Sequence, residues 1–488
     1  MSSGIILLIV SIYFILLLVI SLYTARGASN ESFFIGKKSS KWYLVAYGMI
    51  GTVLSGVTFM SVPGKVQTNH FHYLQVVIGY LMGYLVVAYV LLPIYYKMNV
   101  TSIYTYLKVR FGKTTYKTGA SFFLLSRTLG ASLRIYLVLY VLQKFIIDDW
   151  GVPFFVTAFI VLFMILLYTF KGGVKTIVFT DTLQTTFMLL ALVVTLYLIK
   201  SELHFTASGL FNSLKLNNYT EVFSYDWRAK SFFVKQILGG AFITISMTGL
   251  DQEMMQKNIS IRTLAEAQKN MVSFSFISVI TNSLFLVLGG ALYVFAMAKN
   301  VPLTQQTDDI FPTITLHFLP PVVGIIFIIG LISAMFPSAD GAMTALTSSF
   351  CIDVLGFNER TDWDEAKKQN RRMLVHASVA VIFLAIVLVC KAINNKAIID
   401  LVLDLASYTY GPLLGLFAFG VFTKRGVKDD WVPVVCVLSP VVSFLLNFYA
   451  DKIIPGYKIG LELLLINGLL TFTGLYFIST NNRKQVLA

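Results

Sequence analysis

Long apolar segments separated by short polar ones dominate this chain of 488 residues. The first, residues 4–23, has no charged side chain, and about 20 such residues are what a helix needs to cross a membrane. No basic residue precedes it and no small-residue cleavage site follows it, so we expect a retained helix and no signal peptide. The same pattern predicts thirteen membrane spans, near 4–23, 41–62, 73–96, 119–143, 153–170, 177–199, 232–250, 271–298, 321–353, 373–393, 398–423, 431–449 and 457–479.

The composition agrees with this pattern. Apolar residues make up 57% of the chain and charged residues 13%, against about 45–50% and about 25% in soluble proteins. A soluble fold of this size cannot bury so much apolar surface, and a disordered chain has few aromatic residues, whereas 14% are aromatic here. Three cysteines without a CxxC spacing give no sign of a disulfide framework. The sequence therefore predicts a polytopic membrane protein.

The basic residues predict the orientation of the spans. If the N-terminus lies outside, 24 of the 38 Lys and Arg residues fall in inside segments and 12 in outside segments. An inside excess of basic residues is the general rule for such proteins. We therefore expect the N-terminus outside and the C-terminus inside, as an odd number of spans requires. The expected location is the cell membrane, which is the inner membrane in a bacterium.

Enzyme motifs are missing from the sequence. It contains no HExxH, GxSxG or P-loop, and its longest connections, residues 200–231, 299–320 and 354–372, are too short for a catalytic or nucleotide-binding domain. The expected partners are a small-molecule substrate, an ion and the lipid bilayer, with no nucleic acid and no obligate protein partner. This pattern indicates a transport protein without a cofactor.

Five ionisable residues lie at membrane depth by this prediction: Arg127, Arg134, Asp181, Asp340 and Asp404. Such residues are costly in lipid, so each is either a functional site or half of a buried ion pair. The two arginines are seven residues apart and share one helix face. Because few acids are predicted at the same depth, we expect excess positive charge facing the core, which an anionic solute would compensate.

Glycine, proline and hydroxyl residues interrupt three of the spans. Residues 48–64 and 238–249 are rich in Gly, Ser and Thr, and each begins one of two groups of five spans. Interrupted helices at corresponding places in two halves are typical of secondary transporters built from inverted repeats, although close helix packing also favours small residues. Residues 333–341 add Pro337 beside Ser and Asp, which predicts a kinked helix rich in oxygen ligands. Oxygen ligands suit a hard cation such as Na⁺.

Four segments resemble motifs of the sodium:solute symporter family, whose members include sodium/glucose, proline and sialic acid transporters. Residues 172–184 are similar to its GG…TD..Q motif, and residues 251–257 to its DQ…Q(R/K) segment. The span that ends at residues 351–353 and the segment 408–415 resemble two further motifs of the family. The resemblance extends over essentially the whole chain and is specific because the four motifs occur together.

The resemblance implies an all-α membrane protein with the LeuT-type five-plus-five inverted repeat in spans 2–11. The expected organisation is a first peripheral helix and inside loop, a first repeat, an outer loop, a second repeat and two C-terminal helices. These units are residues 1–40, 41–200, 201–231, 232–424 and 425–488.

The family's principal sodium site implies five ligand positions. Carbonyl oxygens at the break of the first core helix correspond to Gly51 and Leu54, and further ligands on the eighth core helix correspond to Ala334, Pro337 and Ser338. Pro337 lies where the family usually has a hydroxyl group. A carbonyl, a water molecule or the nearby Asp340 is then needed as the replacement ligand.

Part of the family has an additional sodium site, whose positions correspond to Asp181, Asp340 and Gly341. A carboxylate in place of a hydroxyl group strengthens a cation site or converts it into a proton site, and both alternatives stay open. The resemblance therefore implies that either one or two Na⁺ ions bind in each transport cycle.

Substrate residues of the family line the broken first helix, which makes Ser55 and Thr58 candidates, with Gln75 as a third. Arg134 resembles the arginine that holds a substrate carboxylate in the sialic acid branch, and the planar guanidinium suits such a group. The alternative is a structural Arg134, bonded to Asp404 or to helix carbonyl groups.

Taken together, these features predict a secondary transporter that couples inward Na⁺ movement to uptake of a small polar solute by alternating access. Arg134 favours a carboxylate-bearing solute, and Na⁺ is the coupling ion. The alternative is a sensor with a transporter fold, or a Na⁺-leak channel, which binds or conducts without coupled accumulation. The solute itself is not named by the sequence.

Overall fold

The computed structural model describes most of the chain, namely residues 3–24, 33–34, 38–303, 306–393 and 398–481. Most of the first predicted inside loop and the basic pair at 483–484 lie outside the described residues. Both segments contribute basic residues to the predicted orientation.

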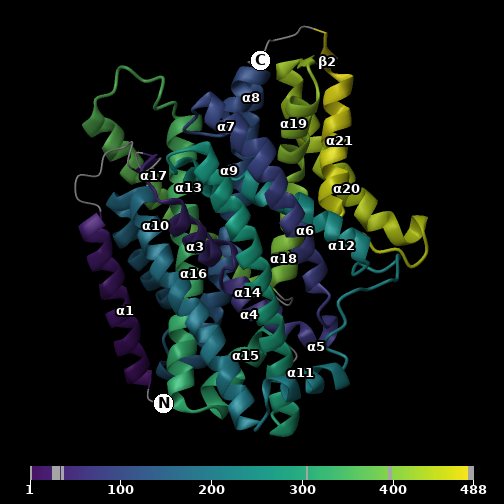
Figure 1. Ribbon diagram of the computed structural model, residues 1–488. Helices are drawn as coiled ribbons and strands as arrows, with labels where there is room; N and C mark the ends of the chain where they lie inside the picture. The colour runs from purple at the N-terminus through teal and green to yellow at the C-terminus, as the bar shows by residue number, and fades with distance from the viewer. Residues whose placement is uncertain (1–2, 25–32, 35–37, 304–305, 394–397, 482–488) are drawn as a thin grey trace.

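The described chain is a bundle of helices that run between two opposite ends, with α1 on one flank and α20 and α21 on the other (Figure 1). The start of α1 lies at one end, and the short strand β2 lies at the opposite end (Figure 1). The helices of the first half are α1 (Ser3–Thr24), α3 (Trp42–Val53), α4 (Gly56–Gly64), α5 (Val66–Asn69), α6 (Tyr73–Val86), α7 (Leu92–Met98), α8 (Thr105–Arg110), α9 (Lys113–Leu142) and α10 (Phe154–Glu202).

The second half of the chain also consists of long helices joined by short connections. Its helices are α11 (Ala207–Leu216), α12 (Phe233–Thr244), α13 (Gln252–Ile259), α14 (Leu264–Ala298), α15 (Ile310–Thr313), α16 (Pro321–Ser349), α17 (Glu365–Ile393), α18 (Ile398–Thr409), α19 (Gly411–Phe422), α20 (Val432–Ile453) and α21 (Leu463–Phe477). The strands β1 (Gly426–Val427) and β2 (Ser479–Thr480) form a small antiparallel pair.

Short turns of other helix types extend several of these helices. The π-helical turns are η2 (Val87–Leu91), η3 (Gln143–Ile147), η5 (Ile245–Gly249), η7 (Ile314–Phe318) and η8 (Phe350–Val354). The 3₁₀ turns are η4 (Asp148–Trp150), η6 (Thr307–Asp309) and η9 (Asp429–Trp431). Isolated π-helical turns occur often at functional sites, and η5 lies at the bend of one interrupted span.

Eight helices in the described residues are long and apolar enough to cross a membrane, and the number rises to 11 if each of three bent pairs counts as one span. The shorter apolar helices Phe154–Phe170 and Leu463–Phe477 overlap the two remaining predicted spans. The mostly helical architecture with many apolar helices therefore agrees with the sequence analysis.

The three bent pairs are α3 with α4, α12 and η5 with α13, and α18 with α19, with angles of 54°, 64° and 46°. The first two are the spans in which glycine and hydroxyl residues predicted an interruption. The third was not predicted. At Pro337, where the sequence predicts a kink, α16 is not broken and runs as one helix through the residue. Proline removes only one backbone hydrogen bond, and the packed neighbours of α16 hold the helix together.

Two glycines allow close packing around the first break. A Cβ atom on Gly51 would lie 2.5 Å from Oγ1 of Thr185, and one on Gly56 would lie 2.4 Å from Cγ2 of Val138. Any larger side chain at these positions would push α3 away from α10, or α4 away from α9. The small residues therefore fix the position of the break within the core.

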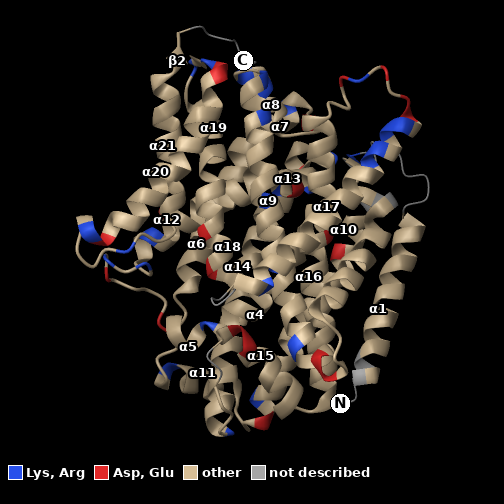
Figure 2. Cartoon of the chain, turned by 180° about the vertical axis from the view of Figure 1, so that it is seen from behind, with Lys and Arg blue, Asp and Glu red and all other residues tan. Residues whose placement is uncertain are grey.

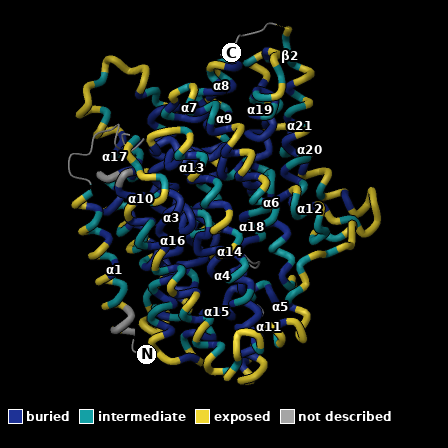
Figure 3. Tube along the Cα trace, in the orientation of Figure 1, coloured by how far each residue is buried: buried dark blue, intermediate teal, exposed yellow. Residues whose placement is uncertain are grey.

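Burial and charge are distributed as a membrane protein requires. The central helix α16 is buried along nearly all of its second half, whereas α1 is largely exposed on the rim of the bundle (Figure 3). Lys and Arg residues gather near α7, α8 and the start of α17, at the end of the molecule where β2 lies (Figure 2). This is the end that the sequence analysis predicts to be inside.

Candidate sodium and substrate sites

The break between α3 and α4 lies directly against α16. The Ser338 hydroxyl donates a hydrogen bond of 3.2 Å to the carbonyl oxygen of Thr52, and a Cβ atom on Gly51 would lie 3.5 Å from Cγ of Pro337. The last carbonyl groups of a helix have no partner within it, and α3 ends just before Leu54. The structure thus brings Gly51 beside Pro337 and the last turn of α3 beside Ser338, and Ala334, one turn earlier on α16, is fully buried.

A second group of polar residues lies beside this junction. Oδ2 of Asp181 accepts hydrogen bonds from Nζ of Lys257 at 2.7 Å and from Oγ1 of Thr52 at 3.2 Å. Oδ2 of Asp340 accepts a hydrogen bond of 2.6 Å from the Tyr168 hydroxyl. In each carboxylate the Oδ1 atom is buried and has no hydrogen-bond partner among the described residues.

Gly341, the third predicted position of this group, packs against another acid. A Cβ atom on Gly341 would lie 2.3 Å from Oε1 of Glu253, so only glycine fits there in this arrangement. Glu253 is held by α13, whose N-terminus is capped by Asp251 through the backbone N–H groups of residues 253 and 254. The bend before α13 therefore brings an acidic residue into the core.

Lys257 and Glu253 belong to the motif 251–257, but the sequence analysis did not predict that they lie beside the candidate cation ligands. Lys257 was counted there as an inside-loop charge, but the structure buries it between Asp181 and Glu253. The available signal was their spacing, because an acid and a lysine four residues apart face the same side of a helix. Neither residue is among the five predicted at membrane depth, because α13 is a polar helix that follows the apolar run 232–250.

The expectation of excess positive charge around both arginines is wrong for Arg127. Its guanidinium forms a buried ion pair with Glu253, and Oδ2 of Asp251 lies 3.8 Å from its Nη1. Asp251 also accepts a hydrogen bond of 2.7 Å from the Tyr410 hydroxyl. The bent α13 supplies acids at a depth where the linear sequence showed none.

Arg134 differs from Arg127. Within the part of the chain that the structure describes, its guanidinium makes no hydrogen bond or ion pair, and it lines a cavity of about 80 Å³. Other residues of this central cavity come from the first break, from α6, from η5 and from α14 and α18; they include Leu54, Ser55, Thr58, Tyr73, Tyr80, Tyr84, Thr248, Asn282, Ile399 and Leu403. The cavity is thus polar, aromatic and adjacent to the predicted sodium ligands.

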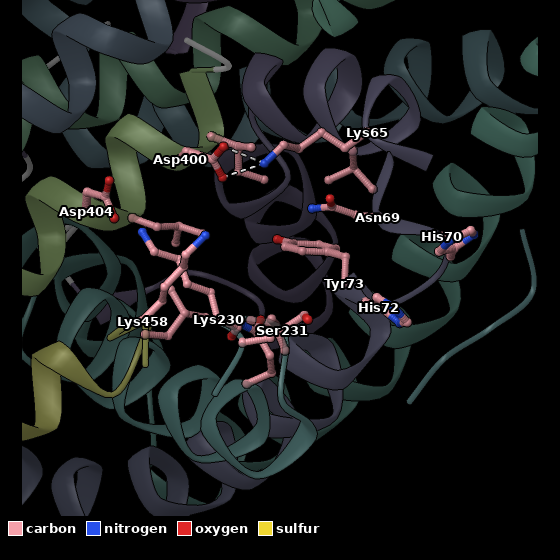
Figure 4. A pocket seen from close by; sticks show the side chains of 18 of the residues that line it. Lys65, Asn69, His70, His72, Tyr73, Lys230, Ser231, Asp400, Asp404 and Lys458 are labelled. Carbon is pink, nitrogen blue, oxygen red and sulfur yellow. Dashed lines mark hydrogen bonds and ion pairs between the residues drawn. The ribbon is translucent and has the colours of Figure 1, made fainter. Parts of the chain in front are cut away.

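A larger cavity of about 690 Å³ lies next to the central one, and we call it the vestibule. Tyr73, Ile399 and Leu403 line both cavities and form the layer between them. Lys65 and Asp400 form an ion pair of 2.5 Å on one wall, and Lys230 and Lys458 extend from the opposite side (Figure 4).

His72 lines the vestibule, and both His72 and Gln75 form hydrogen bonds to the loop between α11 and α12. Burial lowers the pKa of His72 below its ordinary value. The Gln75 amide nitrogen donates to the carbonyl oxygens of His72 and Ser231, at 3.0 and 3.3 Å. The structure places Gln75 outside the lining of the central cavity, apart from Ser55, Thr58 and Arg134.

Known proteins provide an independent comparison. The chain is 23% identical over 458 residues to the sodium/sialic acid symporter SiaT of Proteus mirabilis, covering 91% of this chain and 90% of that protein. It is 23% identical to the human sodium-coupled monocarboxylate transporter 1, covering 80% of this chain and 64% of that protein.

The fold has solved counterparts as well. A substrate-bound, outward-open structure of a Na⁺-coupled sialic acid symporter matches with a TM-score of 0.82 at 19% identity, over 98% of this chain and 99% of that one. This likeness establishes a LeuT-like fold. The family model of the sodium:solute symporter family matches residues 33–429. The members of this family are transporters and not enzymes, and the chain belongs to it.

Proposed function

We propose that this protein couples inward Na⁺ movement to the uptake of a small solute that carries a carboxylate. One observation carries the proposal: the unpaired guanidinium of Arg134 faces the central cavity beside the broken helix that carries the predicted sodium ligands. A buried charge without a partner is costly, and a solute carboxylate would pair with it. Binding of solute and Na⁺ at adjacent places gives a direct means of coupling them.

The proposed principal sodium site consists of carbonyl oxygens of Gly51, Leu54 and Ala334 together with Ser338 and the region of Pro337. Its support is the contact between Ser338 and the last turn of α3. Oxygen ligands of this kind suit Na⁺. A second cation position is proposed at Asp181, Asp340 and Gly341, because two buried carboxylates repel each other unless a positive charge lies between them.

The proposed solute site contains Ser55, Thr58 and Arg134. Hydroxyl groups from the break face the same cavity as the guanidinium, so a solute with both a carboxylate and polar groups would satisfy them. The names of two relatives fit this chemistry, because sialic acids and monocarboxylates both bear a carboxylate. Gln75 is not part of the proposed solute site, because its amide nitrogen bonds the outer loop.

The proposed architecture has thirteen spans, arranged as two inverted repeats of five with one helix before and two after them. The repeats are residues 41–200 and 232–424, separated by the loop 201–231. Support comes from the eight long helices, three bent pairs and two shorter apolar helices. The proposal places the N-terminus outside and the C-terminus inside, in the cell membrane, with a single chain as the working unit.

Uptake into proteoliposomes tests the function. Purified protein is reconstituted, and radiolabelled sialic acid, lactate, glucose and proline are offered with an inward Na⁺ gradient, an inward K⁺ gradient or no gradient. We expect accumulation of a carboxylate-bearing solute above its external concentration only with the Na⁺ gradient. Binding without accumulation would indicate a sensor, and Na⁺ flux without a solute would indicate a leak channel. Preference for glucose over both acids would contradict the role of Arg134.

A further inference from the structure

The second cation position already contains a positive charge that belongs to the protein. Nζ of Lys257 lies 2.7 Å from Oδ2 of Asp181, 2.7 Å from Oγ1 of Thr52 and 3.7 Å from Oε1 of Glu253. All four residues are buried, with at most 3% of their surface exposed. The ammonium group is therefore surrounded by oxygen atoms, as a bound alkali-metal ion would be.

The residues around this ammonium group fit it better than they fit a second metal ion. Where the family resemblance implies ligand positions, the chain has Asp340 and Gly341, and the space beside Gly341 is filled by Oε1 of Glu253. Glu253 is itself paired with Arg127.

Charge explains why one cation is needed here. Asp181 and Asp340 interact electrostatically with each other and with Lys257, and an uncompensated carboxylate in a buried site is expensive. Lysine suits the task because its ammonium is a compact point charge with three donors on a flexible chain. A tethered ammonium supplies the charge without drawing an ion from solution.

From this arrangement we infer that the ammonium group of Lys257 takes the place of the second cation, so that the transporter binds a single Na⁺ in each cycle. The inference rests on the proposed function, because it assumes that a Na⁺ ion binds at Gly51, Leu54, Ala334 and Ser338. The same arrangement makes Lys257 a positioning residue for the proposed principal sodium site.

The positioning role of Lys257 follows from the two hydrogen bonds that Thr52 accepts. The Thr52 hydroxyl accepts a hydrogen bond from Lys257, and its carbonyl oxygen accepts one from Ser338. Thr52 thus lies between the tethered ammonium and the proposed principal sodium site. Lys257 holds the last turn of α3 in place while Ser338 orients toward the ion.

Direct counting of bound sodium tests the inference. Purified full-length protein is equilibrated with radioactive Na⁺ at saturating concentration, and bound ions per chain are measured for the wild type, Lys257→Met, Lys257→Arg and the double variant Lys257→Met with Asp181→Asn. We expect one ion for the wild type, two for Lys257→Met, one for Lys257→Arg and one for the double variant. Removal of the ammonium opens the second position, and removal of the Asp181 charge closes it again.

The outcomes separate this inference from the proposed function. Two ions bound by the wild type would overturn the inference and leave Na⁺ coupling intact, whereas no bound Na⁺ in the wild type would contradict the proposed function itself. One ion bound by folded Lys257→Met would also overturn the inference. Lys257→Gln, which keeps a polar group near Thr52, provides the same comparison if the methionine variant does not fold.

Discussion

Arg127 and Arg134 lie two helical turns apart on α9, yet they have different surroundings and should respond differently to mutation. Arg127 is paired with Glu253, whereas Arg134 makes no hydrogen bond or ion pair within the described residues. For Arg134→Lys we expect a ten- to hundredfold weaker solute affinity, since a charged hydrogen bond contributes about 1.5–3 kcal/mol and lysine lacks the planar fork. Solute titration by isothermal calorimetry checks this.

The matched variant Arg127→Met should lose folding stability, whereas Arg134→Lys should lose solute affinity. It leaves Glu253 buried without its partner, which costs about 3–5 kcal/mol of stability. Thermal unfolding without solute should therefore be nearly unchanged in Arg134→Lys and strongly lowered in Arg127→Met. Equal loss of thermal stability in both variants would mean that Arg134 has a structural role.

Ser338 is the residue whose side chain most directly tests the principal sodium site. Ser338→Ala removes an oxygen atom next to the break, so the Na⁺ concentration for half-maximal uptake should rise several-fold while maximal uptake at saturating Na⁺ changes less. The control is Ser283→Ala on α14, whose hydroxyl bonds only to the carbonyl oxygen of Val279. An unchanged Na⁺ dependence in Ser338→Ala would remove this hydroxyl from the site.

At the scale of single elements, α10 is the helix that joins two predicted spans across a sharp bend. Gly173 lies at that bend with φ 57° and ψ −154°, a conformation that residues with a Cβ atom rarely adopt. A Cβ atom there would also lie 2.4 Å from Cα of Phe33. The second glycine of the family's GG motif is thus explained by its backbone conformation and close packing.

Gly173→Ala should lower the thermal unfolding temperature, because this essentially glycine-only backbone conformation costs about 1–3 kcal/mol for a residue with a side chain and the contact with Phe33 adds to it. The control is Gly130→Ala in the middle of α9, where a Cβ atom would meet nothing within 4 Å. Alanine is favoured over glycine inside a helix by about 1 kcal/mol, so that variant should be as stable as the wild type or more stable. Unfolding followed by intrinsic fluorescence compares the two.

At the scale of the whole molecule, the proposed orientation can be measured with cysteine labelling. Cys351, Cys390 and Cys436 are all buried, so the wild-type protein should react little with a membrane-impermeant maleimide. Lys458→Cys, at the exposed rim of the vestibule, should react in intact cells. Lys424→Cys, between α19 and β1, should react only after the membrane is permeabilised. The reverse pattern would invert the topology.

Much of the architecture was predictable from the sequence because membrane spans depend on local composition. A run of about 20 apolar residues forms a helix in lipid whatever its neighbours are, since every backbone polar group must be satisfied within it. The interruptions near Gly51 and Gly249 were predictable for a related reason, because glycine and hydroxyl residues weaken a helix where they occur. For Pro337 such reasoning does not say whether the helix breaks, because that depends on the helices packed around it, and α16 continues through the residue.

The sequence by itself determined the protein class, the apolar spans, two of the three bends and the motifs that identify the family. Only the tertiary structure decided which charges meet. The pairing of Arg127 with Glu253 and of Lys257 with Asp181 joins residues 126 and 76 positions apart, so no local pattern specifies it. The bend before α13 determines these pairings, because the bend turns a polar segment at the end of a span into the core. Charges that are close in space, and not in sequence, determine which arginine is free for a solute and which cation fills the second position.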